Sequence, residues 1–190
     1  MATVTTKPIT AEEFYEFTHR PENRDRVFEL ERGEIVEMSR PGKRHGLVCG
    51  NVTGILRNYA IARKKGYVCS NDTGVVEDRD PDTVRGPDVL FFEDAQNFAE
   101  VEEKYGENPP MLAIEVLSPN DTYAEIRERI KDQLTFGTKL VWVLDPEARK
   151  ITVHRPGDDY SLGENDELTG DKVLPDFRCK VAEFFNLPGQ

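Results

Sequence analysis

Residues 111–119 read MLAIEVLSP, and residues 85–92 read RGPDVLFF. Each stretch contains a short apolar run of the kind that forms a core strand. Each also carries one carboxylate, Glu115 in the first and Asp88 in the second. Burying a lone carboxylate costs several kcal/mol unless it is paired, hydrogen-bonded or bound to a metal. Both acids therefore need partners, and the neighbouring sequence has to supply them.

Helix and strand signals extend outward from these two strands. Residues 10–18 begin with a capping box, in which Thr10 is the N-cap and Glu13 follows three residues later. Residues 27–38 alternate like a hairpin around Gly33. The other predicted elements are a helix over 45–65 with Gly66 as its C-cap, strands over 67–70 and 74–77, a polar loop over 78–86, an exposed excursion over 93–110, a helix entry over 118–121, a helix over 122–136 ending at Gly137, strands over 139–145 and 151–155, a hairpin-like region up to 177, and a short helix over 181–186.

This order predicts an α/β fold, with a mixed β-sheet flanked by helices and additional hairpins. The chain has 190 residues, shows no internal repeat or linker, and is expected to form a single domain over residues 1–190. Apolar residues make up 37% and charged residues 32%, which is typical of soluble globular proteins. No window approaches 18 uninterrupted apolar residues, so we expect no membrane span.

The compartment is predicted from the N-terminus and the cysteines. The first ten residues, MATVTTKPIT, lack the apolar core of a signal peptide. Cys49, Cys69 and Cys179 are an odd number of cysteines without CxxC spacing. They fit free or buried thiols better than a disulfide framework or a zinc site. We therefore expect a cytoplasmic protein.

The charge is unevenly distributed. The net charge of −11 argues against a nucleic-acid partner, yet residues 1–70 hold 12 Lys or Arg and only 9 Asp or Glu. No acid occurs between Glu37 and Asp72. This interval carries Arg40, Lys43, Arg44, Arg57, Arg63, Lys64 and Lys65. Such residues either form a basic face that attracts phosphates of DNA or belong to an ordinary basic helix that balances acidic loops.

The two strand carboxylates predict a metal site if their strands are neighbours. Asp88 and Glu115 would then converge on one side of the sheet. Oxygen ligands of this kind suit Mg²⁺, which also neutralises the repulsion between two carboxylates. The alternative is structural: Asp88, which follows Pro87, is a turn residue, and Glu115 pairs with an arginine.

The chain also resembles a known family. Pro87-Asp88 followed by a glutamate in an apolar strand resembles the PD-(D/E)XK nuclease superfamily. A closer resemblance, over about residues 8–187, is to the Uma family (the second of that name) of restriction-endonuclease-like proteins. The blocks that carry it are FELERGEIVEM, the helix start at His45-Gly46, RGPDVLFF, LAIEVLSPND, LVWVLDPE and VLPDF. The resemblance implies a restriction-endonuclease-like α/β core, a Mg²⁺-dependent nuclease site and a homodimer.

The resemblance also implies site residues. Asp88 and Glu115 correspond to metal ligands, with the backbone carbonyl of Val116 as a third. The superfamily's lysine would stand at position 117, where this chain has leucine. In the family, the basic residue comes instead from the following helix, and counting back from its terminal glycine gives Arg129, with Lys131 two positions later.

Helical geometry places Arg129 and Lys131 on opposite flanks of an apolar face formed by Ile126, Ile130 and Leu134. The flank of Arg129 is polar close to the core, so we favour Arg129 as the site residue and keep Lys131 for its chemistry. Arginine stabilises phosphoryl charge but is a poor proton-transfer group. The structural alternative is a surface pair between Glu125 and Arg129.

Two further residues, Glu29 and His45, match the N-terminal family blocks. By this resemblance, Glu29 is expected to approach the metal from the first hairpin or its neighbouring helix, and His45 to contact phosphate or a metal-bound water. A lone histidine is more often structural. His19 and His154 have no companions at ligand spacing and are interpreted as surface residues, and Trp142 as a core residue.

Two functions are consistent with these residues. One is a Mg²⁺-dependent endonuclease (with Mn²⁺ as a substitute) that hydrolyses phosphodiester bonds in DNA. The other is a non-catalytic nucleic-acid-binding or protein-interaction module on the same scaffold, which the leucine at position 117 and the acidic charge favour. The sequence has no GxxxxGK[ST] or GxGxxG phosphate loop and no Ser or Cys nucleophile motif, so neither nucleotide enzymes nor covalent catalysis is indicated.

Overall fold

The computed structural model describes residues 7–119 and 121–189. Within these ranges the α-helices are α1 (Ala11–Thr18), α2 (Lys43–Arg63), α3 (Tyr123–Phe136) and α4 (Ala182–Phe185), with short 3-10 helices at Pro21–Asn23 and Phe98–Glu100. The strands are β1 (Val27–Glu31), β2 (Glu34–Met38), β3 (Tyr67–Ser70), β4 (Val75–Asp78), β5 (Thr83–Arg85), β6 (Val89–Phe92), β7 (Leu112–Val116), β8 (Leu140–Asp145), β9 (Lys150–Arg155), β10 (Asp158–Leu162), β11 (Glu167–Gly170) and β12 (Leu174–Lys180).

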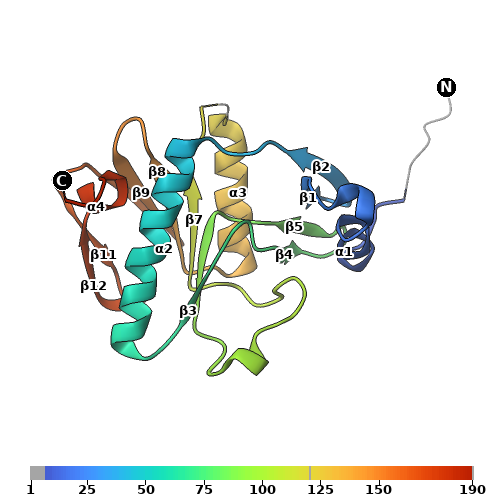
Figure 1. Cartoon of the computed structure of the whole chain (residues 1–190), viewed down its shortest axis with the longest axis horizontal. Helices are drawn as coiled ribbons and strands as arrows, with labels where there is room; N and C mark the ends of the chain where they lie inside the picture. Colours follow the sequence, from blue (N-terminus) through green and yellow to red (C-terminus); the bar gives the residue numbers. More distant parts are fainter. Residues whose placement is uncertain (1–6, 120, 190) are drawn as a thin grey trace.

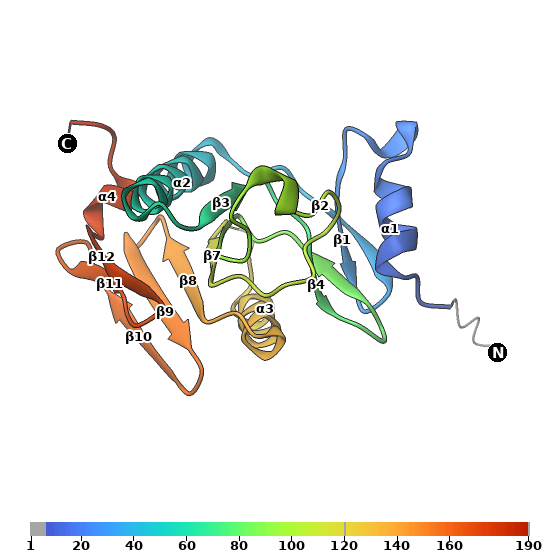
Figure 2. The ribbon, with the colours of Figure 1, turned by 90° about the horizontal axis from the view of Figure 1, so that it is seen from below.

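A six-stranded mixed sheet forms the centre of the fold, in the order β10-β9-β8-β7-β6-β3. Only β7 and β8 run parallel in this sheet, and α3 connects them. Parallel neighbours need a crossover that returns the chain to the same end of the sheet. Figure 2 shows the sheet between α2 and α3. The predicted mixed sheet flanked by helices is therefore confirmed.

The two faces of this sheet form separate apolar cores because side chains alternate along each strand. Val89 and Phe91 of β6 face α2 and pack with Val52 and Leu56. Leu90 and Phe92 face the other way, into a smaller cluster that includes Ile130 of α3. Trp142 is fully buried in the α2-side core, as predicted.

A second sheet lies at the N-terminal side of the molecule, in the order β2-β1-β5-β4 (Figure 1). One of its faces packs against α1 through Leu30, Val76 and Val84, which cluster with Phe14. The capping box of α1 and the β1–β2 hairpin are present as predicted. A two-stranded sheet, β11-β12, is the additional hairpin near the C-terminus.

The predicted ends of the long helix were wrong, and so was the predicted loop over 78–86. The long helix begins at Lys43 and has Lys64, in the left-handed conformation with φ 54°, as its C-cap instead of Gly66. Gly66 also has a positive φ, and a Cβ there would come within 2.4 Å of the Phe91 ring. The predicted loop over 78–86 contains strand β5, whose residues are all buried. The strand was missed because two of its three residues are polar. Their burial is compensated by partners: Thr83 accepts a hydrogen bond from the N–H of Arg32, and Arg85 is ion-paired.

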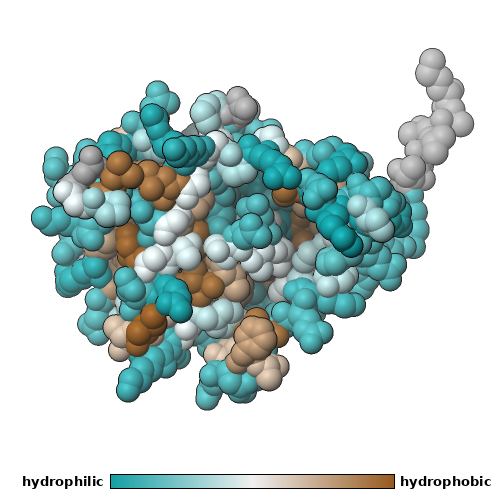
Figure 3. Space-filling view, in the orientation of Figure 1, coloured by the Kyte–Doolittle hydropathy of each residue, from teal (hydrophilic) through white to brown (hydrophobic). Residues whose placement is uncertain are grey.

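Other features concern the surface and the thiols. In Figure 3 hydrophilic side chains cover the region of α1 and the β1–β2 hairpin, whereas apolar side chains reach the surface beside α2. No helix in the described ranges is long and apolar enough to cross a membrane. Cys49, Cys69 and Cys179 are free thiols. Residues 1–6 of the N-terminal segment and Asn120 of the predicted helix entry lie outside the described residues.

Candidate active site

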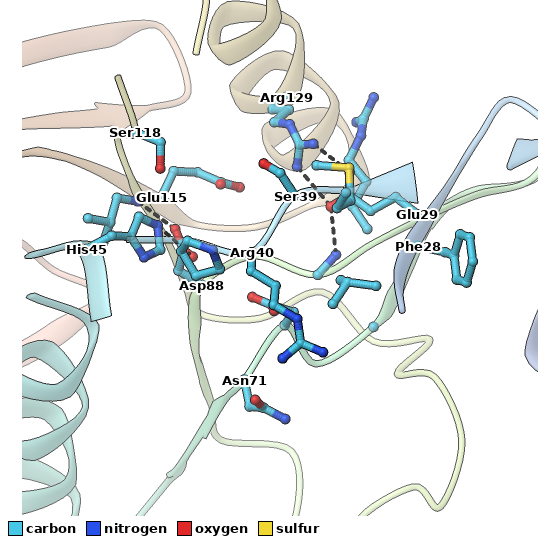
Figure 4. A pocket seen from close by; sticks show the side chains of 18 of the residues that line it. Phe28, Glu29, Ser39, Arg40, His45, Asn71, Asp88, Glu115, Ser118 and Arg129 are labelled. Atoms are coloured by element: carbon cyan, nitrogen blue, oxygen red, sulfur yellow. Dashed lines mark hydrogen bonds and ion pairs between the residues drawn. The ribbon is translucent and has the colours of Figure 1, made fainter. Parts of the chain in front are cut away.

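Asp88 and Glu115 are brought together by the pairing of β6 with β7. The antiparallel register joins Val89 to Ile114 and Leu90 to Ala113. Continuing this register by one residue puts Asp88 opposite Glu115. Both belong to the α3-facing set of their strands, because each is two residues from a member of the α3-side core. The two carboxylates therefore converge at the end of β6 (Figure 4).

Asp88 has a partner on each carboxylate oxygen. Its Oδ2 accepts a hydrogen bond of 2.7 Å from the N–H of Val116, and its Oδ1 lies 3.1 Å from Nε2 of His45. The N–H and C=O of one strand residue point to the same neighbouring strand. The carbonyl of Val116 therefore also faces the side on which Asp88 lies.

His45 is at the start of α2 and bridges two residues. Its Nε2 faces Asp88, and its Nδ1 lies 3.4 Å from the sulfur of Cys49, one helical turn later. The hydrogen bond with Asp88, followed by that with Cys49, raises the pKa of His45 to about 10. At neutral pH the ring is therefore an imidazolium that donates from both nitrogens. Burial raises the pKa of the Cys49 thiol, so that thiol stays protonated.

Glu115 is buried in the wall of the site. The amide of Gln133 on α3 donates a hydrogen bond of 2.5 Å to its Oε1. Its Oε2 accepts no hydrogen bond from any described residue. Burial raises the pKa of Glu115 to about 8, and Asp88 and Glu29 add to this rise, while Arg129 and Gln133 oppose it. This buried carboxylate lacks a direct cationic partner.

Arg129 projects from α3 toward β1. Its guanidinium binds both carboxylate oxygens of Glu29, with an Nη1 to Oε1 distance of 3.0 Å. Glu29 Oε1 also accepts from the N–H of Gly86. The alternative Glu125–Arg129 pair is absent from the ion pairs of the described residues, because Glu125 instead completes the capping box of α3 with Thr122.

A pocket of about 470 Å³ collects these residues. Its lining includes Glu29, His45, Asp88, Glu115, Val116 and Arg129. Figure 4 shows Asp88, His45 and Glu115 close together, with the Arg129–Glu29 pair beside them. Lys131 lies elsewhere, in a second groove beside α3 that it shares with Tyr123 and the half-buried His154.

Cys49 and Gln133 are contacts that sequence reasoning missed as site residues. The spacing of Cys49 from His45, four residues on one helix, was the available signal for the first. Gln133 was visible only as a polar residue on the same flank as Arg129. Its contact with Glu115 depends on how α3 packs on β7, which the spacing of residues does not reveal.

The seven residues of the predicted basic face are divided between the two ends of α2. The first group, Arg40, Lys43 and Arg44, adjoins the pocket, which Arg40 lines. The second group, Arg57, Arg63, Lys64 and Lys65, lies toward the far end of a 21-residue helix that is about 30 Å long. Arg63 and Lys65 both pair with Glu93. Only the first group is placed to meet a ligand of the pocket.

An ion-paired seam joins the N-terminal sheet to α3 beside the pocket. It consists of the pairs Arg129–Glu29, Arg32–Glu128 and Arg85–Asp132. Arg85 also binds Glu77, whose side chain is only 2% exposed. Burial raises the pKa of Glu77 from 4.5 to about 7, although Arg85 opposes the rise.

This shift predicts a pH-dependent stability. Between pH 4.5 and 7 the folded chain holds a proton on Glu77 that the unfolded chain has lost, so the free energy of unfolding falls as pH rises. We expect Glu77→Gln to remove this contribution, which is at most about 1.4 kcal/mol per pH unit. Urea unfolding at pH 5, 6 and 7 measures it, with the exposed Glu34→Gln as control. An unchanged slope in Glu77→Gln would contradict the assignment.

The donor set fits a hard divalent cation. Asp88, Glu115 and the Val116 carbonyl offer oxygen ligands, the type that Mg²⁺ and Mn²⁺ take. The undonated oxygen of Glu115 is a ligand position that no described side chain uses. A cation here would also replace the proton that burial and the neighbouring acids favour on Glu115.

Comparisons with known proteins show the family of the chain and a solved structure with a similar fold. The model of the family Uma2, described as "Putative restriction endonuclease", matches residues 11–182. Among solved structures, the fold is similar to that of a protein from Anabaena variabilis ATCC 29413 described as "a putative nuclease belonging to DUF820". The TM-score is 0.76 at 19% sequence identity, over 94% of this chain and 98% of that one. No curated protein matches the chain.

Proposed function

Because the chain belongs to the Uma2 family of restriction-endonuclease-like proteins, we propose that it is a divalent-metal-dependent endonuclease that hydrolyses phosphodiester bonds in DNA. The observation that carries the proposal is the convergence of Asp88 and Glu115 at one end of a pocket that also holds the half-buried Arg129. Asp88, Glu115 and the carbonyl of Val116 would hold Mg²⁺ or Mn²⁺. A bound cation of this kind polarises a phosphate and lowers the pKa of a coordinated water.

The chain's own basic groups account for the substrate's charge. Arg129 is the basic residue in the pocket, and Lys131 is assigned no role there because it lies in the other groove. A guanidinium holds phosphate oxygens in a bidentate manner and stabilises charge that develops on them. Glu29 positions Arg129 through their two hydrogen bonds. His45, as an imidazolium, adds a donor next to Asp88.

Cleavage of supercoiled plasmid in Mg²⁺ or Mn²⁺ tests the proposal, with EDTA as control. Nicked or linear product that forms only with the cation supports it. Isothermal titration of each cation, into wild type and into the Asp88→Ala/Glu115→Ala double variant, tests the metal site separately. Saturable binding that persists in the double variant would refute the assigned ligands.

The basic residues near the pocket predict where DNA binds. Reversing Arg40, Lys43 and Arg44 to glutamate should weaken DNA binding and reduce the slope of log K against log[salt] by up to about 2.7, because each neutralised phosphate contributes about 0.9. The matched control is the reversal of Arg57, Lys64 and Lys65 at the far end of α2. Fluorescence anisotropy with a short duplex at several salt concentrations measures both. Equal losses would show that total charge, and not location, controls binding.

A second function is favoured by the state of the arginine. Arg129 is paired with both carboxylate oxygens of Glu29, position 117 is leucine, and no lysine of the described residues lines the pocket. A protein that binds DNA without a cation and never cuts it would be a non-catalytic nucleic-acid-binding module on this scaffold. The plasmid assay together with the anisotropy measurement separates the two functions.

Location and assembly complete the proposal. We expect the protein to act in the cytoplasm, where its three thiols stay reduced. We also expect a homodimer, which would place two pockets on one duplex. Sedimentation equilibrium of the full chain measures its mass directly.

A further inference from the structure

His45, Cys49 and Asp88 form a compact group of potential metal ligands. His45 and Cys49 are four residues apart on α2, so their side chains lie on the same face of the helix, one turn apart. Asp88, the residue immediately before β6, lies next to them. One ligand atom from each residue lies within 4.8 Å of those from the other two. No other group of three such residues in the described ranges meets this condition.

We propose that these three side chains bind a thiophilic divalent cation such as Zn²⁺. One nitrogen, one sulfur and one carboxylate oxygen are the donors that Zn²⁺ accepts, whereas Mg²⁺ takes oxygen ligands. Three protein ligands leave the fourth tetrahedral position to water. On binding, bonds form from the cation to Sγ of Cys49 and to one ring nitrogen of His45, and the thiol proton and the proton of that nitrogen pass to solvent.

The three ligand atoms, which lie within 4.8 Å of one another, must move closer together to form such a site. Zn–N and Zn–S bonds of 2.0–2.3 Å put tetrahedral ligands roughly 3.3–3.7 Å apart. In the structure His45 lies 3.1 Å from Asp88 and 3.4 Å from Cys49. These two contacts use different ring nitrogens, so the ring must turn for one nitrogen to meet the cation. Two of the ligands come from one helix, which limits the movement needed.

The site is accessible from the pocket already described. His45 and Asp88 line that pocket, and their side chains are 11% and 14% exposed. Asp88 is also a ligand of the proposed oxygen site with Glu115, and one carboxylate at this position would serve two different cations. Zn²⁺ would therefore exclude Mg²⁺ or Mn²⁺ and suppress cleavage. This consequence rests on the proposed function, but the binding itself does not.

Titration of the full chain with Co²⁺, which replaces Zn²⁺ and is coloured, tests the proposal. We expect the wild type to develop a thiolate-to-cobalt charge-transfer band and the visible bands of a four-coordinate ion, both of which Zn²⁺ abolishes. Cys49→Ser should lose the charge-transfer band and bind Zn²⁺ at least about 10-fold more weakly, since even the loss of a residue that only supports a ligand costs 10–100-fold. The matched control is Cys69→Ser on β3, which should keep the band.

The absence of a thiolate band in wild type, or its persistence in Cys49→Ser, would overturn the proposal. The readout does not involve DNA or cleavage. A protein that never cuts DNA but shows the band refutes the endonuclease and supports the zinc site. A protein that cuts DNA and shows no band supports the endonuclease and refutes the zinc site.

Discussion

Asp88→Asn is expected to abolish cleavage while the protein remains folded. The substitution keeps the shape of the side chain, and its amide oxygen can still accept the hydrogen bond from the N–H of Val116. What it removes is one of two charged metal ligands and the partner of His45. A catalytic cation contributes several kcal/mol to charge stabilisation in the transition state. At 1.36 kcal/mol per factor of ten, the rate should fall by about 10³-fold or more.

Plasmid cleavage rates with Mg²⁺ and Mn²⁺, together with thermal unfolding, measure this effect. Asp94→Asn is the matched control, because Asp94 lies just beyond the opposite end of β6 and binds the hydroxyl of Tyr67. That variant should cut at nearly the wild-type rate. Cation-dependent cleavage by Asp88→Asn at the wild-type rate would rule out the assigned site, regardless of the rate measured for Asp94→Asn.

Arg129→Met should destabilise the fold by about 3–5 kcal/mol. Glu29 is 7% exposed and receives both of its charged hydrogen bonds from Arg129. Removing one member of a buried pair leaves the other charge uncompensated, which is the source of this cost. Arg129 also lowers the pKa of Glu115, so a second carboxylate loses its nearest positive charge.

The double variant Glu29→Gln/Arg129→Met isolates the cause. Replacing both members removes the unpaired charge, so much of the lost stability should return. Lys131→Met is the matched control, because it removes an exposed positive charge from the same helix and should change stability by less than about 0.5 kcal/mol. Urea unfolding at pH 7.5 compares the four proteins. A cost for Arg129→Met no larger than that for Lys131→Met would show that the pair does not stabilise the fold.

Most of the fold was predictable because its strands and helices carry strong local signals. Residues 140–144 are a continuous apolar run, residues 112–116 are apolar except for Glu115, and Thr122 and Gly137 mark both ends of α3. Strand β5 was missed because its stability comes from contacts outside the segment. Thr83 and Arg85 are polar, and their burial is made favourable by partners outside the strand: Arg32 and Asp132, more than 45 residues away along the chain, and Glu77 on β4.

Most residues of the candidate site could be predicted to lie together, but their pairing could not. The two strand carboxylates could be identified because apolar strands rarely carry acids. That Arg129 lies toward the pocket and Lys131 away from it follows from the direction in which α3 crosses the sheet, which helical spacing alone left open. The contact between His45 and Cys49 was available in the spacing, but only the position of Asp88 shows what the two could bind together.

The ion-paired seam determines which surfaces water would reach if the N-terminal sheet and α3 separated. Apolar surface raises the heat capacity when water reaches it, whereas polar surface lowers it. Parting the seam would wet mainly guanidinium and carboxylate groups and leave the core around Phe14 and the core around Trp142 dry. Val75 at the start of β4 is an apolar contact with the α3-side core. The N-terminal sheet is thus attached to α3 largely through charged side chains, and separating the two would expose little apolar surface to water.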